Sequence, residues 1–191
     1  MNRLPALDPA TATGKSKTLL DAVQKKLGRT PNMMRTLGNA PAALEAYLGF
    51  SGALATGTLD AKVREQIALT VAEANVCEYC LAAHTAIGGM VGLTADEIGK
   101  ARGATSSQPK TAAILKLARS IVVNRGNVPD QDLAAARSHG ITDGEVVEIV
   151  ANVALNIFTN YLNHVARTVV DFPAVAPSSP ATCETGTCRT H

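Results

Sequence analysis

Apolar side chains recur at helical spacing along most of this chain. Residues 15–28 place Leu19, Leu20, Val23 and Leu27 on one face and stop at Gly28, a residue typical of helix ends. Further apolar runs of this kind occupy residues 42–55, 60–71, 114–126, 129–140 and 142–170. Few stretches alternate between apolar and polar residues as strands do. The pattern predicts an all-α chain.

Residues that cap helices indicate where several of these elements begin. Pro31 and Pro41 suit the first turn of a helix because the missing N–H has no partner there. The predicted N-terminal caps are Asp60, Asn75 followed by Glu78, Thr94 followed by Glu97, and Thr142 followed by Glu145. The start at Asn75 predicts a helix through Ile87 that ends at Gly88-Gly89. The start at Thr142 predicts a long helix toward Val170.

The composition changes after Phe172, where small residues and prolines replace large apolar ones. We expect residues 1–173 to form one compact helical domain and residues 174–191 a flexible tail. The tail contains Cys183 and Cys188. This pair is either an unstructured feature or a mobile dithiol that passes reducing equivalents to other cysteines.

One spacing occurs twice in the chain. Glu65 and His84 are 19 residues apart, and Glu145 and His164 repeat that spacing with an offset of 80. Both stretches follow a predicted helix start. The repeat indicates either a duplicated helical hairpin or a coincidence.

The charge distribution and the start of the chain indicate which partners and which cell compartment to expect. A formal charge of +2 comes from 18 basic and 16 acidic residues without a basic run, which argues against nucleic-acid binding. The start of the chain does not resemble a signal peptide, and no segment has the profile of a membrane span. We therefore expect a cytoplasmic protein, in which thiols stay reduced and serve catalysis or metal binding more often than structural disulfides.

Two thiols and an imidazole lie within eight consecutive positions. Cys77, Cys80 and His84 occupy i, i+3 and i+7, so a helix would place them on one face. Two such cysteines near a helix end can close a disulfide with modest adjustment. His84 can accept the proton of Cys80, whereas the helix start near Asn75 would favour the thiolate of Cys77. These two effects point to different sulfurs as the nucleophile.

Other interpretations of the same segment also exist. The cysteines and histidine can be ordinary buried residues. They can also bind zinc, although a fourth ligand is then needed and no second pair of metal ligands is evident. Glu73, one turn before Cys77, would approach the thiols if the helix were continuous there.

Glu65, Cys77-Glu-Tyr-Cys80 and His84 together resemble a family signature. A Glu twelve residues before a CxxC, with a His four residues after it, is similar to the alkyl hydroperoxidase D-like members of the carboxymuconolactone decarboxylase superfamily. The surrounding sequence resembles the peroxidase-related branch, as do Pro31-Asn-Met, Asn160-Tyr-Leu-Asn-His164 and Asp171-Phe-Pro. The resemblance covers roughly residues 20–173.

This resemblance implies an all-helical homo-oligomer, often a trimer or hexamer, that reduces hydroperoxides with thiols and without a metal or other cofactor. Cys80 then matches the peroxidatic cysteine and Cys77 the resolving one. His84 would be the base, and Glu65 would orient it within a proton relay. An external thiol or dithiol would reopen the disulfide.

One position departs from the family pattern. Tyr79 lies where the best-studied members have a histidine between the two cysteines, so either the relay is weaker or Tyr79 supplies a phenolic proton donor. His164 is interpreted as a hydrogen-bonded histidine at a helix or subunit contact, or else as a second proton donor near the thiols. Other functions compatible with the sequence are a general thiol–disulfide oxidoreductase, a lactone decarboxylase, a zinc-binding protein and a redox-sensing oligomer.

Overall fold

The computed structural model describes residues 3–178, which form helices and connecting loops without a strand. The predicted all-α fold is confirmed for this part of the chain. Its helices are α1 (Gly14–Leu27), α2 (Asn32–Leu37), α3 (Pro41–Leu54), α4 (Ala61–Ala74), α5 (Glu78–Met90), α6 (Ala95–Arg102), α7 (Pro109–Val123), α8 (Asp130–Ser138) and α9 (Asp143–Ala166).

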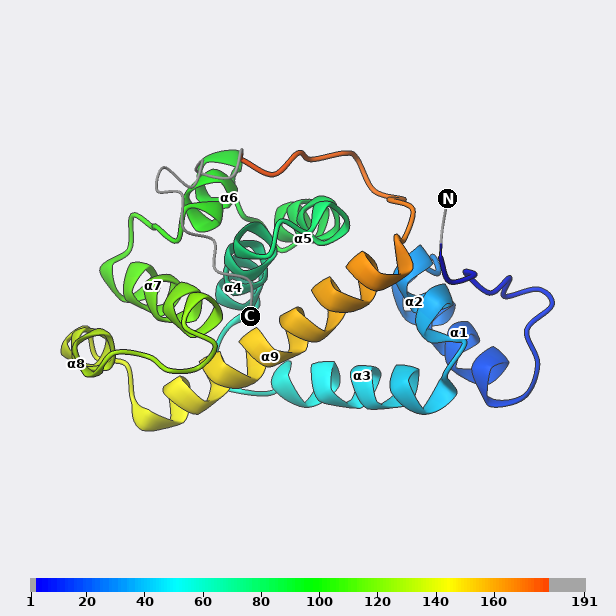
Figure 1. The fold of residues 1–191 in the computed structure, drawn as a ribbon, viewed down its shortest axis with the longest axis horizontal. Coiled ribbons are helices and arrows are strands. Elements are labelled where there is room, and N and C mark those ends of the chain that lie inside the picture. Colours follow the sequence, from blue (N-terminus) through cyan, green and yellow to red (C-terminus); the bar gives the residue numbers. More distant parts are fainter. Residues whose placement is uncertain (1–2, 179–191) are drawn as a thin grey trace, which may run out of the picture.

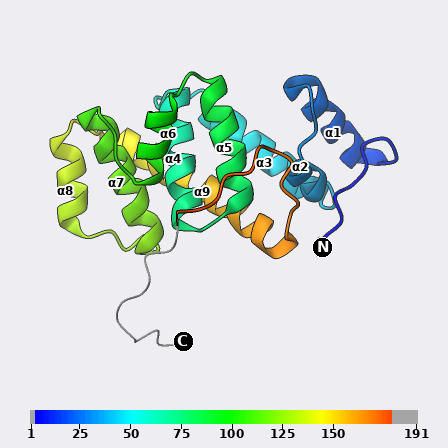
Figure 2. The ribbon, with the colours of Figure 1, turned by 90° about the horizontal axis from the view of Figure 1, so that it is seen from above.

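Helix α4 is the centre of the fold. It packs against α5, α6, α7 and α9, and every residue from Gln66 to Ala72 is buried. The long helix α9 crosses the molecule, with α1–α3 toward one end and α6–α8 toward the other (Figures 1 and 2). This arrangement encloses the α4–α5 pair, and with it the cysteine segment, in the middle of the protein.

Most of the predicted helix starts are present. The side chain of Asp60 caps α4 by accepting a hydrogen bond from the N–H of Val63, and Thr94 and Thr142 form complete capping boxes at α6 and α9. The predicted start at Asn75 is wrong, because Asn75 ends α4 and Cys77 is the N-cap of α5. Helix α5 also continues through Gly88-Gly89 to Met90.

The turn between α4 and α5 is unusually tight. The N–H of Cys77 donates to the carbonyl of Ala72 at 2.9 Å, and the intervening Val76 adopts a left-handed conformation with φ 53°. Glycine usually occupies the left-handed position in a helix end with this hydrogen-bond pattern, and a β-branched residue such as Val76 is strained there. Helix α4 therefore ends and α5 begins within three residues, which holds the first thiol against the end of α4.

The repeated Glu–His spacing does not mark a duplicated hairpin. Glu65 and His84 lie on two helices, α4 and α5, whereas Glu145 and His164 both lie on the single helix α9. The prediction of a repeated hairpin at these positions is wrong. Helix α9 itself begins as predicted but ends at Ala166, before Val170.

The segment after α9 runs across α5 toward α6 (Figure 2). Val175 packs against the core, and the N–H of Ser178 donates to Glu73 at 2.6 Å, so residues 174–178 already contact the helical body. A flexible tail from residue 174 stays a prediction, and Cys183 and Cys188 lie outside the described residues. Within residues 3–178, no helix combines the length and apolar character needed to cross a membrane.

Candidate redox site

The first turn of α5 carries both cysteines. Cys77 is the N-cap residue, and its sulfur accepts a hydrogen bond from the N–H of Cys80 at 3.4 Å. Both residues are free thiols, only 1% and 2% exposed. The local spacing thus brings the two sulfurs together at a helix N-terminus, where the helix dipole favours negative charge.

The surroundings of the two thiols favour Cys80 as the thiolate. A hydrogen bond from Cys77 lowers the pKa of Cys80 to about 7, and this effect, with the charge of His84 and hydrogen bonds from Asn163 and Asn160, outweighs burial. The Nδ2 of Asn163 lies 3.3 Å from the Cys80 sulfur. The same hydrogen bond, followed by burial, raises the pKa of Cys77. The charge of His84 and the hydrogen bond between the two thiols therefore both favour Cys80 as the attacking sulfur. The helix dipole, which would favour Cys77, does not decide which sulfur attacks.

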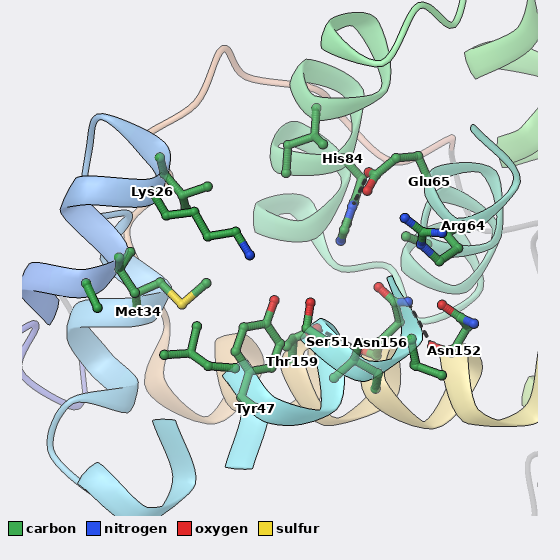
Figure 3. A pocket seen from close by; sticks show the side chains of 18 residues that line it. Lys26, Met34, Tyr47, Ser51, Arg64, Glu65, His84, Asn152, Asn156 and Thr159 are labelled. Carbon is green, nitrogen blue, oxygen red and sulfur yellow. Dashed lines mark hydrogen bonds and ion pairs between the residues drawn. The ribbon is translucent and has the colours of Figure 1, made fainter. Parts of the chain in front are cut away.

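Glu65 and His84 form an ion pair between α4 and α5. The Glu65 Oε2 lies 2.7 Å from Nδ1 of His84, and both side chains are largely buried. Burial lowers the pKa of His84, but the charge and hydrogen bond of Glu65, followed by the charge of Cys80, raise it above its ordinary value. Because Nδ1 faces the carboxylate, Nε2 is the nitrogen directed into the neighbouring cavity (Figure 3).

This cavity has a volume of about 370 Å³ and is lined by α1, α3, α4, α5 and α9, with Met34 of α2. Glu65 and His84 form one side of it (Figure 3). Cys80 is not in the wall but lies one helical turn before His84 on α5, and its charge helps to raise the pKa of both His84 and Tyr47. Burial is the main reason that the pKa of Tyr47 reaches about 12.

Cys77 lines a second cavity, of about 390 Å³. Its other walls come from the start of α5 and the end of α9; they are Val76, Glu78, Tyr79, Asn163, His164, Arg167, Thr168 and Val170. The two cavities share no wall residue. The redox pair therefore lies between two separate hollows, with Cys77 facing one and the Glu65–His84 pair facing the other.

His164 lines the second cavity together with Cys77. Its Nε2 donates to the backbone carbonyl of Asn75 at 2.9 Å, so it satisfies the end of α4. This contact matches a hydrogen-bonded histidine at a helix contact. A role of His164 as a second proton donor stays a prediction, and in this geometry it would act on Cys77.

The hydroxyl of Tyr79 is engaged away from the His84 cavity. It accepts a hydrogen bond from the N–H of Met33 at 3.0 Å and donates to Asp171 at 2.8 Å. Its ring packs edge-on against Phe172, and burial raises the pKa of Tyr79. The geometry favours an anchor between α5, α2 and the C-terminal segment over a proton donor to the relay.

Asp171 holds this anchor together. Its second oxygen accepts from the N–H of Asn32 at 3.0 Å and pairs with Arg29 at 2.6 Å. The guanidinium of Arg29 lies 4.4 Å from the centre of the Phe172 ring. These contacts fix the segment after α9 against the first turn of α5 and thereby position the cysteines.

Glu73 does not approach the thiols. It pairs with Arg102 at 2.7 Å and accepts from the N–H of Ser178, because α4 ends before Cys77 and turns its last face toward α6. The condition for Glu73 to approach the site, a helix continuous through Cys77, is therefore not met. Within residues 3–178, no three side chains of His, Cys, Asp or Glu are grouped to hold a metal ion.

Two residues at the site were not assigned to it from the sequence. Asn163 was visible only as part of a polar cluster, and Tyr47 lies in an alanine-rich helix with no distinguishing motif. The sequence does contain a pattern that could have identified Asn163: side-chain amides and a hydroxyl recur on the buried face of the otherwise apolar α9. These residues are Asn152, Asn156, Thr159, Asn160 and Asn163.

A comparison with protein-family models matches residues 41–120 to the carboxymuconolactone decarboxylase family. The match includes Glu65, both cysteines and His84. A comparison with curated protein sequences finds no significant match.

Solved structures resemble the chain over most of its length. A peroxidase-related protein with an alkylhydroperoxidase AhpD core from Ralstonia eutropha JMP134 is 27% identical, with a TM-score of 0.77 over 89% of this chain and 92% of that one. A peroxidase-related protein from Silicibacter sp. TM1040 is 22% identical, with a TM-score of 0.76 over 87% and 89% of the two chains.

A third solved structure, of the debrominase Bmp8 in complex with 2,3,4-tribromopyrrole, is 18% identical, with a TM-score of 0.76 over 88% and 91% of the two chains. At such identity, likeness to this debrominase and to the Silicibacter protein shows the fold alone. The family match over residues 41–120, together with the fold shared with the Ralstonia protein, supports placing this chain in the AhpD-like, carboxymuconolactone decarboxylase superfamily.

Proposed function

We propose that this protein is a thiol-dependent hydroperoxide reductase that cycles between the Cys77–Cys80 dithiol and its disulfide. One observation carries the proposal: the buried Cys80, with its pKa lowered to about 7, lies one helical turn before His84, whose ion pair with Glu65 opens onto a cavity. A nucleophilic thiolate and a proton source are the two groups that cleavage of an O–O bond requires.

In the first step, the thiolate of Cys80 attacks the terminal oxygen of the hydroperoxide. The O–O bond breaks, Cys80 becomes a sulfenic acid, and the leaving alkoxide takes a proton from Nε2 of His84 to form an alcohol. Glu65 stabilises the protonated imidazole through Nδ1. Sulfur is oxidised by two electrons, and the peroxide is reduced by two.

In the second step, Cys77 condenses with the sulfenic acid. The S–S bond forms and water leaves, carrying the hydroxyl of Cys80 and the proton of Cys77. Cys77 suits this role because its raised pKa keeps it protonated beside the Cys80 thiolate. Once Cys80 is oxidised, its negative charge no longer holds that proton.

An external thiol then reduces the disulfide, and we assign its entrance to the second cavity, whose wall includes Cys77. Attack on the Cys77 sulfur expels Cys80, whose low pKa makes it the better leaving group. A second thiol of the reductant resolves the mixed disulfide. This cycle requires a reducing compartment, which in this proposal is the cytoplasm.

The proposal includes a homo-oligomer. Helix α9 exposes an apolar stripe on the side away from the core, formed by Val147, Val150, Phe158, Tyr161 and Val165. Exposed apolar stripes of this length often mark protein contacts. Light scattering of the purified protein measures its mass directly; a monomer at micromolar concentration would contradict this part.

The function is tested by NAD(P)H-coupled reduction of organic hydroperoxides with candidate thiol donors. We expect turnover by the wild type and none by Cys77→Ser or Cys80→Ser. The Cys77→Ser variant should still form a sulfenic acid on Cys80, detectable with a sulfenic-acid probe, whereas Cys80→Ser should not. Full activity of Cys80→Ser, or stoichiometric zinc released only on unfolding, would refute the proposal.

A further inference from the structure

The cavity beside His84 is polar on one side and apolar on the other. Asn152, Asn156 and Thr159 of α9 lie next to the Glu65–His84 pair (Figure 3). The remaining wall is mostly aliphatic; it includes Val23, Leu27, Met34, Leu48, Leu54 and Ile87. Its volume of about 370 Å³ lies within the range of sites for small organic molecules, which is about 300–1,000 Å³. Hydrogen peroxide alone would leave this apolar wall without a ligand.

Lys26 extends into this cavity from the last turn of α1, and its ammonium group points toward the interior, across from His84 (Figure 3). Within residues 3–178, Lys26 has no ion-pair partner, whereas Lys15 and Lys17 on the same helix pair with Glu45 and Asp21. The carboxylate that lines the cavity, that of Glu65, is already paired with His84.

Arg64 adds a second positive charge to the wall. Its guanidinium donates to the carbonyl of Leu59 at 2.5 Å, and it forms no ion pair among the described residues. With Glu65 and His84 compensating each other, the cavity carries an excess of positive charge. Such an excess in a concave, mostly apolar site favours an anionic ligand.

We propose that the cavity binds organic hydroperoxides that carry a carboxylate, with Lys26 as the residue that recognises the carboxylate. The aliphatic wall would contact the body of the substrate, and the peroxide group would lie at His84. The inference rests on the proposed hydroperoxide reductase activity. It adds a substrate class and a specificity-determining residue remote from the thiols.

The test compares a medium-chain hydroperoxy fatty acid with its methyl ester, which differs only in charge at the carboxyl end. We expect the wild type to show about a fivefold lower KM for the acid and a similar kcat for both, because binding at Lys26 is the same in the ground and transition states. Raised salt should shrink this difference by screening.

Lys26→Met keeps the aliphatic stem and removes the charge, so it should abolish the preference for the acid. Lys26→Arg should restore it. Lys25→Met is the matched control, since Lys25 lies on the same turn but not in the cavity wall, and it should behave as wild type.

A binding measurement separates this inference from the proposed activity. Calorimetry with octanoate and with methyl octanoate, neither of which is a peroxide, should show binding of octanoate that weakens about fivefold in Lys26→Met. Equal KM for acid and ester, or octanoate binding unaffected by Lys26→Met, would overturn the inference. Octanoate binding that depends on Lys26 in a protein that reduces no peroxide would instead refute the proposed function alone.

Discussion

Replacing Cys77 by alanine should raise the pKa of Cys80 from about 7 to its ordinary value near 9 or above. The hydrogen bond from Cys77 is the largest of the effects that lower this pKa, and burial acts in the opposite direction. Without that bond, the charge of His84 and the amide of Asn163 remain to offset burial. Cys77→Ser is the matched control, because serine keeps a hydroxyl donor at the same position.

The expected change in rate follows from two opposing effects. At pH 7, a pKa of about 7 gives about one half thiolate, and a pKa of about 9 gives about 1%, a loss of about 50-fold. A more basic thiolate is more nucleophilic, by about six- to tenfold for this change if the Brønsted coefficient is about 0.4–0.5. Cys77→Ala should therefore react about five- to eightfold more slowly at pH 7, and faster than the wild type well above pH 9.

The assay is the initial rate of reaction of Cys80 with a small aromatic disulfide between pH 5 and 11. Cys183→Ser and Cys188→Ser are introduced in every protein so that only the redox pair reacts. The midpoint of the pH profile should lie near 7 in the wild type, near or above 9 in Cys77→Ala, and between them in Cys77→Ser. An unchanged midpoint in Cys77→Ala would refute the assignment of the low pKa to this hydrogen bond.

Three further substitutions test the surroundings of the thiols. Glu65→Gln removes the charge that raises the pKa of His84 against the effect of burial, so the alkaline limb of peroxide reduction should move to lower pH; an unmoved limb would contradict the relay. Tyr79→Phe leaves the N–H of Met33 and the Oδ1 atom of Asp171 without their hydrogen bonds to the phenol, and it should lower the free energy of unfolding in urea by about 1–3 kcal/mol. Its reaction with peroxide should be unchanged, whereas a large loss in the folded variant would assign Tyr79 to the relay. Asn163→Leu should raise the pKa of Cys80, but less than Cys77→Ala does; the reverse order would show that the amide dominates.

The features that the sequence predicted are local ones. The capping boxes at Thr94 and Thr142 involve residues three apart, and the arrangement of Cys77, Cys80 and His84 follows from the helix period. The start of α5 was misjudged because Asn75 is a good N-cap residue and no glycine marks the turn. The left-handed turn falls instead on Val76, which sequence propensity argues against.

The contacts that set the chemistry of the site are remote in the chain. Asn163 reaches Cys80 across 83 residues, and Tyr79 reaches Asp171 across 92. Only the packing of α9 and the following segment against α5 brings them together. The same holds for the cavity, in which α1 places Lys26 opposite His84. Composition and periodicity carry no information on such pairings.

The central claim is that Cys77 and Cys80 together supply the two electrons that reduce a hydroperoxide. Its most direct test is the addition of one equivalent of hydroperoxide to the reduced protein, followed by thiol titration and peptide mapping. We expect the peroxide to be consumed, two thiols per chain to disappear, and the peptides of Cys77 and Cys80 to be joined by a disulfide. If both cysteines remain free while the peroxide persists, or if it is consumed without oxidising them, the proposed cycle is wrong.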